Sequence, residues 1–186
     1  RLLQMPGNKR LEAPDMTTPI YKSTIGVMIR QAEALVGIMA AGRAHLGDGA
    51  DAFIDEKLIE DMLPFSFQIR AVCHQSMGGI HSMRSGEAGP PPNMEIGSYA
   101  QLETLLTDTI AELKTIDPAE LDRLLDNDLI FVLGDFKLPF KGLGFLTSFM
   151  VPNFFFHMTT AYNLLRQKGV PIGKREYLGA MDMNMG

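Results

Sequence analysis

The sequence contains no tryptophan, a single cysteine and no strong excess of charge of either sign. Because Cys73 stands alone, the chain cannot form an internal disulfide, which excludes a disulfide scaffold and permits a reducing compartment. The net charge of -5 lacks the basic excess by which proteins hold nucleic-acid phosphates. We therefore expect a cytoplasmic protein that binds no nucleic acid.

Long hydrophobic runs are also missing. The most apolar segment, residues 145–156, contains polar residues and is too short to cross a bilayer, so we expect no association with a membrane. Residues 1–15 carry charges and prolines without the apolar centre of a secretory leader, and we interpret them as either an ordered N-terminal arm or a disordered leader. The length and the 46% of hydrophobic residues predict one globular domain over residues 16–179, followed by a tail over residues 180–186.

Four segments have apolar residues at helical spacing. These stripes lie in residues 25–39, 65–83, 102–113 and 152–167. Ser98 is placed to cap the third helix and Asp117 to cap a short helical turn after it. Residues 129–132 and 136–140 flank a Leu-Gly-Asp turn and predict a small hairpin. The sequence thus predicts an all-α fold: a four-helix bundle with a small β-hairpin before the last long helix.

The common motifs of nucleotide, zinc, calcium and serine-hydrolase sites do not occur, so candidate chemistry rests on four histidines. His74 and His81 share one face of the second helix, roughly opposite its apolar stripe, and predict a solvated pair. A surface metal pair or a contact with a partner is the alternative. His45 at the end of the first helix is interpreted as a capping residue.

His157 differs because it lies on the apolar side of the fourth helix. Asn153 precedes it by one turn and Thr160 follows it by three residues, so three polar groups share that face. Polar groups in a core need partners, because an unpaired one costs about 1–3 kcal/mol. We expect the partner to be Gln68 on the second helix or, failing that, Asp61 just before it. Such a cluster either fixes the packing of the bundle or forms a pocket for a small molecule or a metal.

Residues 152–179 read PNFFFHMTTAYNLLRQKGVPIGKREYLG, and this run resembles the C-terminal signature of an uncharacterised DinB-like family. Residues 59–69, IEDMLPFSFQI, resemble another stretch of that family, and the resemblance covers residues 17–179. It implies a DinB-like four-helix bundle, often a homodimer in the wider superfamily. Many superfamily members bind a divalent metal through three histidines, two of them in HxxxH on the last long helix.

This sequence departs from the metal-binding pattern. Ala161 stands where HxxxH would place its second histidine, and the amide oxygen of Asn153 is a weak ligand that suits hard cations better than zinc. No cofactor is predicted, and a divalent metal on His157 stays an alternative. The family pattern keeps the five polar residues singled out above, namely Asn153, His157, Thr160, Asp61 and Gln68.

Our leading hypothesis is a small-molecule enzyme with a pocket in the bundle. His157 would act as general acid/base, with Asn153 as its catalytic neighbour, in an isomerisation, cyclisation or group transfer on an apolar organic substrate. The predicted substrate-binding residues are Gln68, Thr160, Asp61 and Tyr162.

Two alternatives remain open at this point. The first is a non-catalytic bundle that forms a homodimer and uses the buried polar network only for packing. The second is a DinB-like transferase or hydrolase that depends on a divalent metal held by His157 with His74 or His81. Lys174, Arg175 and Tyr177 in the last motif would cover the pocket mouth or contact a second subunit.

Overall fold

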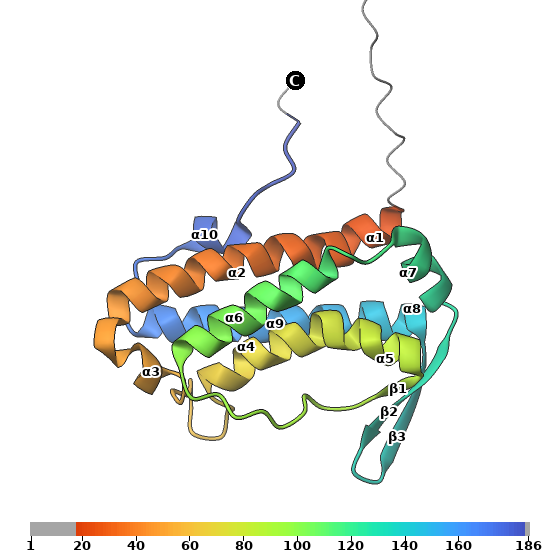
Figure 1. The fold of residues 1–186 in the computed structure, drawn as a ribbon, viewed down its shortest axis with the longest axis horizontal. Coiled ribbons are helices and arrows are strands. Elements are labelled where there is room, and N and C mark those ends of the chain that lie inside the picture. The colour runs from red at the N-terminus through yellow and green to blue at the C-terminus, as the bar shows by residue number, and fades with distance from the viewer. Residues whose placement is uncertain (1–17, 185–186) are drawn as a thin grey trace, which may run out of the picture.

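The computed structural model describes residues 18–184, and its main feature is four long helical runs packed side by side (Figure 1). The four runs are α2 (Ile25–Leu46); α4 (Phe65–Cys73) with η2 (His74–Gly78) and α5 (Gly79–Ser85); α6 (Tyr99–Leu113); and α8 (Gly142–Phe145) with η3 (Leu146–Met150) and α9 (Val151–Gln167). The shorter helices are α1 (Pro19–Ser23), η1 (Gly47–Gly49), α3 (Ala50–Phe53), α7 (Pro118–Leu124) and α10 (Lys174–Leu178). The predicted four-helix bundle is confirmed, whereas the expected N-terminal arm lies outside the described residues.

The predicted hairpin is present and gains a third strand. β2 (Asp128–Leu133) and β3 (Phe136–Lys141) pair antiparallel, and β1 (Glu87–Ala88) pairs in parallel with the middle of β2. At the turn Gly134 takes a positive φ of 57°, which residues with a side chain rarely adopt. Phe131 is buried against Phe149 of η3, with ring centroids 4.8 Å apart. The base of the hairpin therefore rests on the bundle, while its tip extends beyond it (Figure 1).

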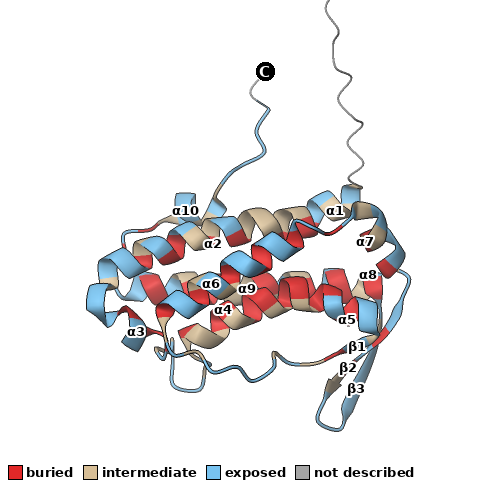
Figure 2. Ribbon diagram, in the orientation of Figure 1, coloured by how far each residue is buried: buried red, intermediate tan, exposed pale blue. Residues whose placement is uncertain are grey.

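The core lies between the inward faces of the four long runs, where the buried residues gather (Figure 2). On α2, Met28, Leu35 and Met39 are fully buried, as the apolar stripe predicts. The helical stretch Pro19–Phe53 has the length and apolar composition of a membrane span, but the core helix of a bundle meets the same criterion. Ser98 and Asp117 cap α6 and α7 through hydrogen bonds to Gln101 N and Ala119 N.

The last long helix begins ten residues earlier than predicted, at Gly142 instead of Pro152. Two polar residues in this earlier part of the helix bond back to the preceding turn: the hydroxyl of Thr147 donates to the Leu143 carbonyl at 2.8 Å, and that of Ser148 donates to the Gly144 carbonyl at 2.5 Å. Proline cannot donate a backbone hydrogen bond and crowds the carbonyl four residues back. The π-turn η3 immediately before Pro152 accommodates this defect within a continuous helix.

The second run also continues through a point where its glycines weaken the helical pattern. η2 is a π-turn, and Gly79 follows it directly. A Cβ at Gly79 would lie 2.3 Å from Cε of Met150, the last residue of η3. The absence of a side chain there lets the second and fourth runs approach closely.

Two glycines of α2 provide a matched test of this packing. A Cβ at buried Gly42 would lie 2.7 Å from the Tyr99 hydroxyl and 2.8 Å from Leu165, whereas exposed Gly37 has open space. We expect Gly42→Ala to lower the free energy of unfolding by about 1–3 kcal/mol through overpacking. Gly37→Ala should raise it by about 0.5–1 kcal/mol, since alanine favours the helix. Urea unfolding of both variants measures the difference, and equal effects of the two would contradict this packing.

Candidate functional site

His157 on α9 faces Gln68 on α4, and the two side chains form the centre of the candidate site. The distance from His157 Nδ1 to Gln68 Oε1 is 2.8 Å, and Gln68 Nε2 donates to the Leu63 carbonyl at 2.8 Å. Because only the amide nitrogen can donate to that carbonyl, the amide oxygen must face the imidazole. This network assigns the proton of neutral His157 to Nδ1 and the lone pair to Nε2. The predicted pairing of His157 with Gln68 is confirmed.

The second ring nitrogen of His157 stays open. Among the described residues Nε2 has no hydrogen-bond partner, and it is not sealed from solvent. The rings of Phe67 and Phe156 meet the imidazole edge-on, with centroids 5.7 and 5.1 Å away. Burial lowers the pKa of His157 to about 4, because a charged imidazole would lose hydration in these surroundings. The site therefore presents a neutral acceptor nitrogen between aromatic rings.

Asn153 lies one turn before His157, on the same half-buried face of α9. Its Nδ2 donates to the Phe149 carbonyl in the π-turn at 2.7 Å. That bond fixes the amide and leaves Oδ1 as an acceptor. Asn153 and His157 thus contribute two acceptors to one face, so a ligand that pairs with both must bring hydroxyl or N–H groups.

The other predicted site residues do not join this pair. Thr160 is buried, but its hydroxyl donates to the Phe156 carbonyl at 2.8 Å within its own helix. Asp61 is exposed and has no hydrogen bond to His157. Tyr162 is on another side of α9, against Tyr177, with ring centroids 5.5 Å apart. Sequence reasoning missed Phe67 and Phe156, although each directly precedes a singled-out residue in the chain.

The remaining histidines lie elsewhere. His81 is exposed, as predicted, and its Nε2 is 2.8 Å from Glu112 Oε1. His74 is half-buried instead of solvated, because the connection after α5 covers it and the Gly89 carbonyl lies 2.9 Å from its Nε2. His45 does not cap its own helix; its Nε2 is 3.2 Å from the carbonyl of Lys168, the C-cap of α9.

The donor set around His157 does not fit a divalent metal. Structural and catalytic zinc sites take at least three protein ligands. Here Gln68 occupies one imidazole nitrogen, Asn153 offers an amide oxygen, and Ala161 contributes none. Within residues 18–184 no group of three His, Cys, Asp or Glu side chains is arranged to hold a metal.

A groove of about 490 Å³ lies on the neighbouring face of α9. Phe156 and Thr160 line it, together with Leu58 and Met62 from the segment before α4. Phe156 contacts both this groove and the ring of His157, and its side chain is 56% exposed. The ring of Phe156 thus separates this groove from the imidazole, which does not itself line it.

The C-terminal motif folds back on its own chain. Tyr177 of α10 shares a hydrogen bond of 2.8 Å with Thr159, which lines the groove, and Gln31 of α2 donates to the Leu178 carbonyl. Lys174 and Arg175 lie on the exposed side of α10. Within its own chain Tyr177 thus reaches only the edge of this groove.

Comparison with known proteins agrees with this fold. A family model described as a domain of unknown function, DUF1993, matches residues 20–178. The crystal structure of a DinB family member protein from Shewanella denitrificans has a TM-score of 0.74 at 21% sequence identity, covering 90% of this chain and 96% of that chain. Among curated proteins nothing matches. The resemblance to an uncharacterised DinB-like family is thereby confirmed, and the chain belongs to the DUF1993 family.

Proposed function

We propose that this protein binds a small apolar organic molecule at His157 and Asn153, and that His157 Nε2 accepts a proton from it. The observation that carries the proposal is the fixed, neutral imidazole with one open nitrogen. Gln68 holds the ring in one tautomer, which is how enzymes orient a histidine base. Asn153 Oδ1 would accept a second hydrogen bond and position the molecule.

The protonation state favours a base over an acid. With a pKa of about 4, His157 is uncharged at neutral pH and has no proton to give from Nε2. Such a weak base suits substrates with comparatively acidic protons, for example an enol, a phenol or a carbon between two carbonyl groups, and it holds their proton only transiently, because these groups are weaker acids than the imidazolium. In an isomerisation the proton taken from one atom returns to another atom of the same molecule, so no further reactant is needed.

The surroundings suit an apolar substrate. Phe67 and Phe156 flank the imidazole, and the groove beside Phe156 has room for the hydrocarbon part of a ligand. This neighbourhood favours binding driven by burial of apolar surface, with the two acceptors setting the orientation.

A structural role is the second candidate, and a specific bond favours it. Gln68 connects the Leu63 carbonyl to His157, so it ties the segment before α4 to both α4 and α9.

Ile59, Leu63 and Phe156 are exposed apolar side chains that a second copy of the chain would cover in a homodimer. If so, Phe156→Ser should convert a dimer into a monomer in sedimentation equilibrium.

Two substitutions of His157 separate the candidates. The amide nitrogen of an asparagine takes nearly the position of the histidine Nδ1, so His157→Asn keeps a hydrogen-bond donor to Gln68 but removes the open acceptor Nε2. We expect His157→Ala to lower the free energy of unfolding by about 1–3 kcal/mol, because Gln68 loses its partner, and His157→Asn to restore most of that loss. Wild type should bind 2-naphthol more tightly than 2-methoxynaphthalene in a fluorescence titration, and His157→Asn should lose this preference. Equal preference in both proteins would overturn the proposed acceptor role.

Proton abstraction is tested separately. Wild type should accelerate the exchange of the acidic C–H of ethyl acetoacetate for deuterium in D2O, followed by NMR. His157→Asn, which keeps the fold, should give the rate of the buffer alone. The same exchange rate with both proteins would contradict the proposal that His157 removes a proton from the bound molecule.

The lowered pKa of His157 makes stability depend on pH in a defined window. Between pH 6.5 and about 4 the unfolded chain binds a proton at this residue and the folded chain does not. Stability should therefore fall as the pH drops through that window, by less than about 1.4 kcal/mol per pH unit because the side chain is only partly buried. His157→Asn should have a flatter profile. Urea unfolding at pH 7, 6, 5 and 4.5 measures both, and parallel profiles would contradict the burial of a neutral imidazole.

A further inference from the structure

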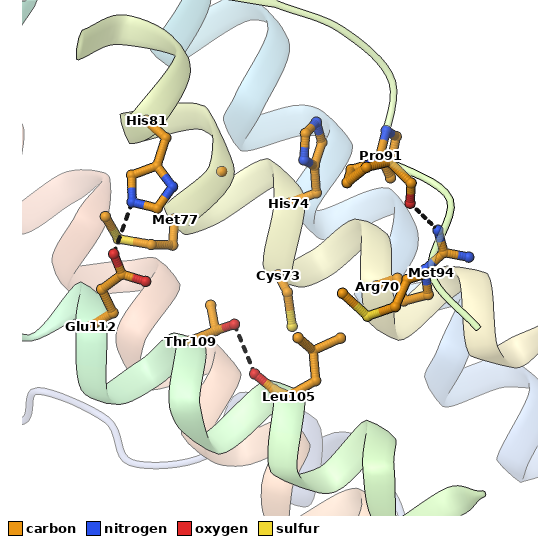
Figure 3. Close-up of a pocket in the computed structure, with 12 residues that line it drawn as sticks. Arg70, Cys73, His74, Met77, His81, Pro91, Met94, Leu105, Thr109 and Glu112 are labelled. Carbon is orange, nitrogen blue, oxygen red and sulfur yellow. Dashed lines mark hydrogen bonds and ion pairs between the residues drawn. The ribbon is translucent and has the colours of Figure 1, made fainter. Parts of the chain in front are cut away.

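A second groove, of about 340 Å³, lies on another part of the bundle and does not include His157. It runs between the α4–α5 run and α6, and residues 91–94 of the connection after β1 form its third side (Figure 3). Cys73, Met77 and Leu105 form its middle, and Met94 and two prolines close the side. The surface of the groove is thus mainly apolar.

The charges of this groove lie at its two ends. At one end His81 and Glu112 pair with each other at 2.8 Å. Arg70 stands at the other end, where it donates to the Pro92 carbonyl and stacks on Phe67, 5.9 Å from the ring centroid. Among residues 18–184 no carboxylate forms an ion pair with Arg70. Arg70 therefore supplies, at its end of the groove, a positive charge that no carboxylate pairs with, while the carboxylate of Glu112 at the other end bonds to His81.

The two polar side chains in the middle of the groove, Thr109 and Cys73, neither attract nor repel the charged group of a ligand. The Thr109 hydroxyl donates to the Leu105 carbonyl at 2.8 Å. Burial raises the pKa of the Cys73 thiol to about 11, so it stays uncharged and does not repel an anion. An arginine has five N–H donors in a fixed fork, and the bond to Pro92 leaves donors that match a carboxylate.

We infer that this groove binds an elongated amphipathic carboxylate, with its carboxylate on Arg70 and its hydrocarbon chain across Cys73, Met77 and Leu105. The eleven helical steps from Arg70 to His81 correspond to about 16 Å along a helix, so a chain of medium length fits along the groove. The inference does not depend on the role of His157, because the two sites have no lining residue in common.

Decanoate and decanol, which differ only in the head group, test the role of Arg70 by titration calorimetry, below the micelle concentration of decanoate and below the solubility limit of decanol. Wild type should bind decanoate at least tenfold more tightly than decanol, and Arg70→Gln should remove that preference while decanol binding stays the same. Arg70→Lys should keep part of the preference, because it keeps the charge and loses the fork. Arg175→Gln, an exposed site on α10, is the control and should match wild type.

The position of the ligand is read from methionine methyl groups. Met77 and Met94 line the groove that contains Arg70. Met28 and Met39, on α2, lie in the hydrophobic core, and Met62 lines the other groove, beside α9. In protein labelled with carbon-13 at the methionine methyls, decanoate should shift the signals of Met77 and Met94 and leave those of Met28, Met39 and Met62 in place. Three results would each overturn the inference. They are shifts confined to Met62, no binding of decanoate to the wild type, and an Arg70→Gln variant that loses affinity for decanoate and decanol equally.

Discussion

The contact between the second and fourth helical runs is the constraint on which the candidate site depends. At one end Gly79 leaves room for Met150, and at the other Gln68 bonds to His157 across the interface. Each run contains a π-turn, which adds a residue to one turn and so shifts the faces that follow it relative to those before.

Burial of the Gln68–His157 pair explains why the site is precise. Gln68 is 2% exposed, and both ends of its amide are bonded, so the side chain has one orientation. That orientation selects the tautomer of His157 and leaves Nε2 open between two aromatic rings. In a buried network that serves packing alone, every polar group normally has a hydrogen-bond partner within the network. The open nitrogen is the part of this network that packing does not require, and such local exceptions cluster at functional sites.

The sequence predicts those features that follow from local rules. Ser98 and Asp117 cap helices because their side chains accept bonds from nearby backbone, and Gln68 pairs with His157 because polar groups on apolar stripes need partners. The early start of the last helix was missed because a fixed period of 3.6 residues takes no account of a π-turn. The bond of Thr160 to its own helix was missed because a threonine can satisfy itself locally. The charged groove depends on the contact of Arg70 with Pro92, 22 residues away, which no local pattern encodes.

Phe67 connects the two sites. Its ring forms a T-shaped pair with His157 and also lies 5.9 Å from the guanidinium of Arg70, so both groups depend on where this ring lies. A carboxylate on Arg70 would weaken the attraction of the guanidinium for the ring, because it neutralises the charge that the ring attracts. A movement of Phe67 would in turn change how far His157 is shielded from water, and that shielding is what keeps its imidazole neutral. Because coupling between two binding sites is reciprocal, a molecule on His157 that fixes Phe67 would alter the affinity at Arg70 by the same factor.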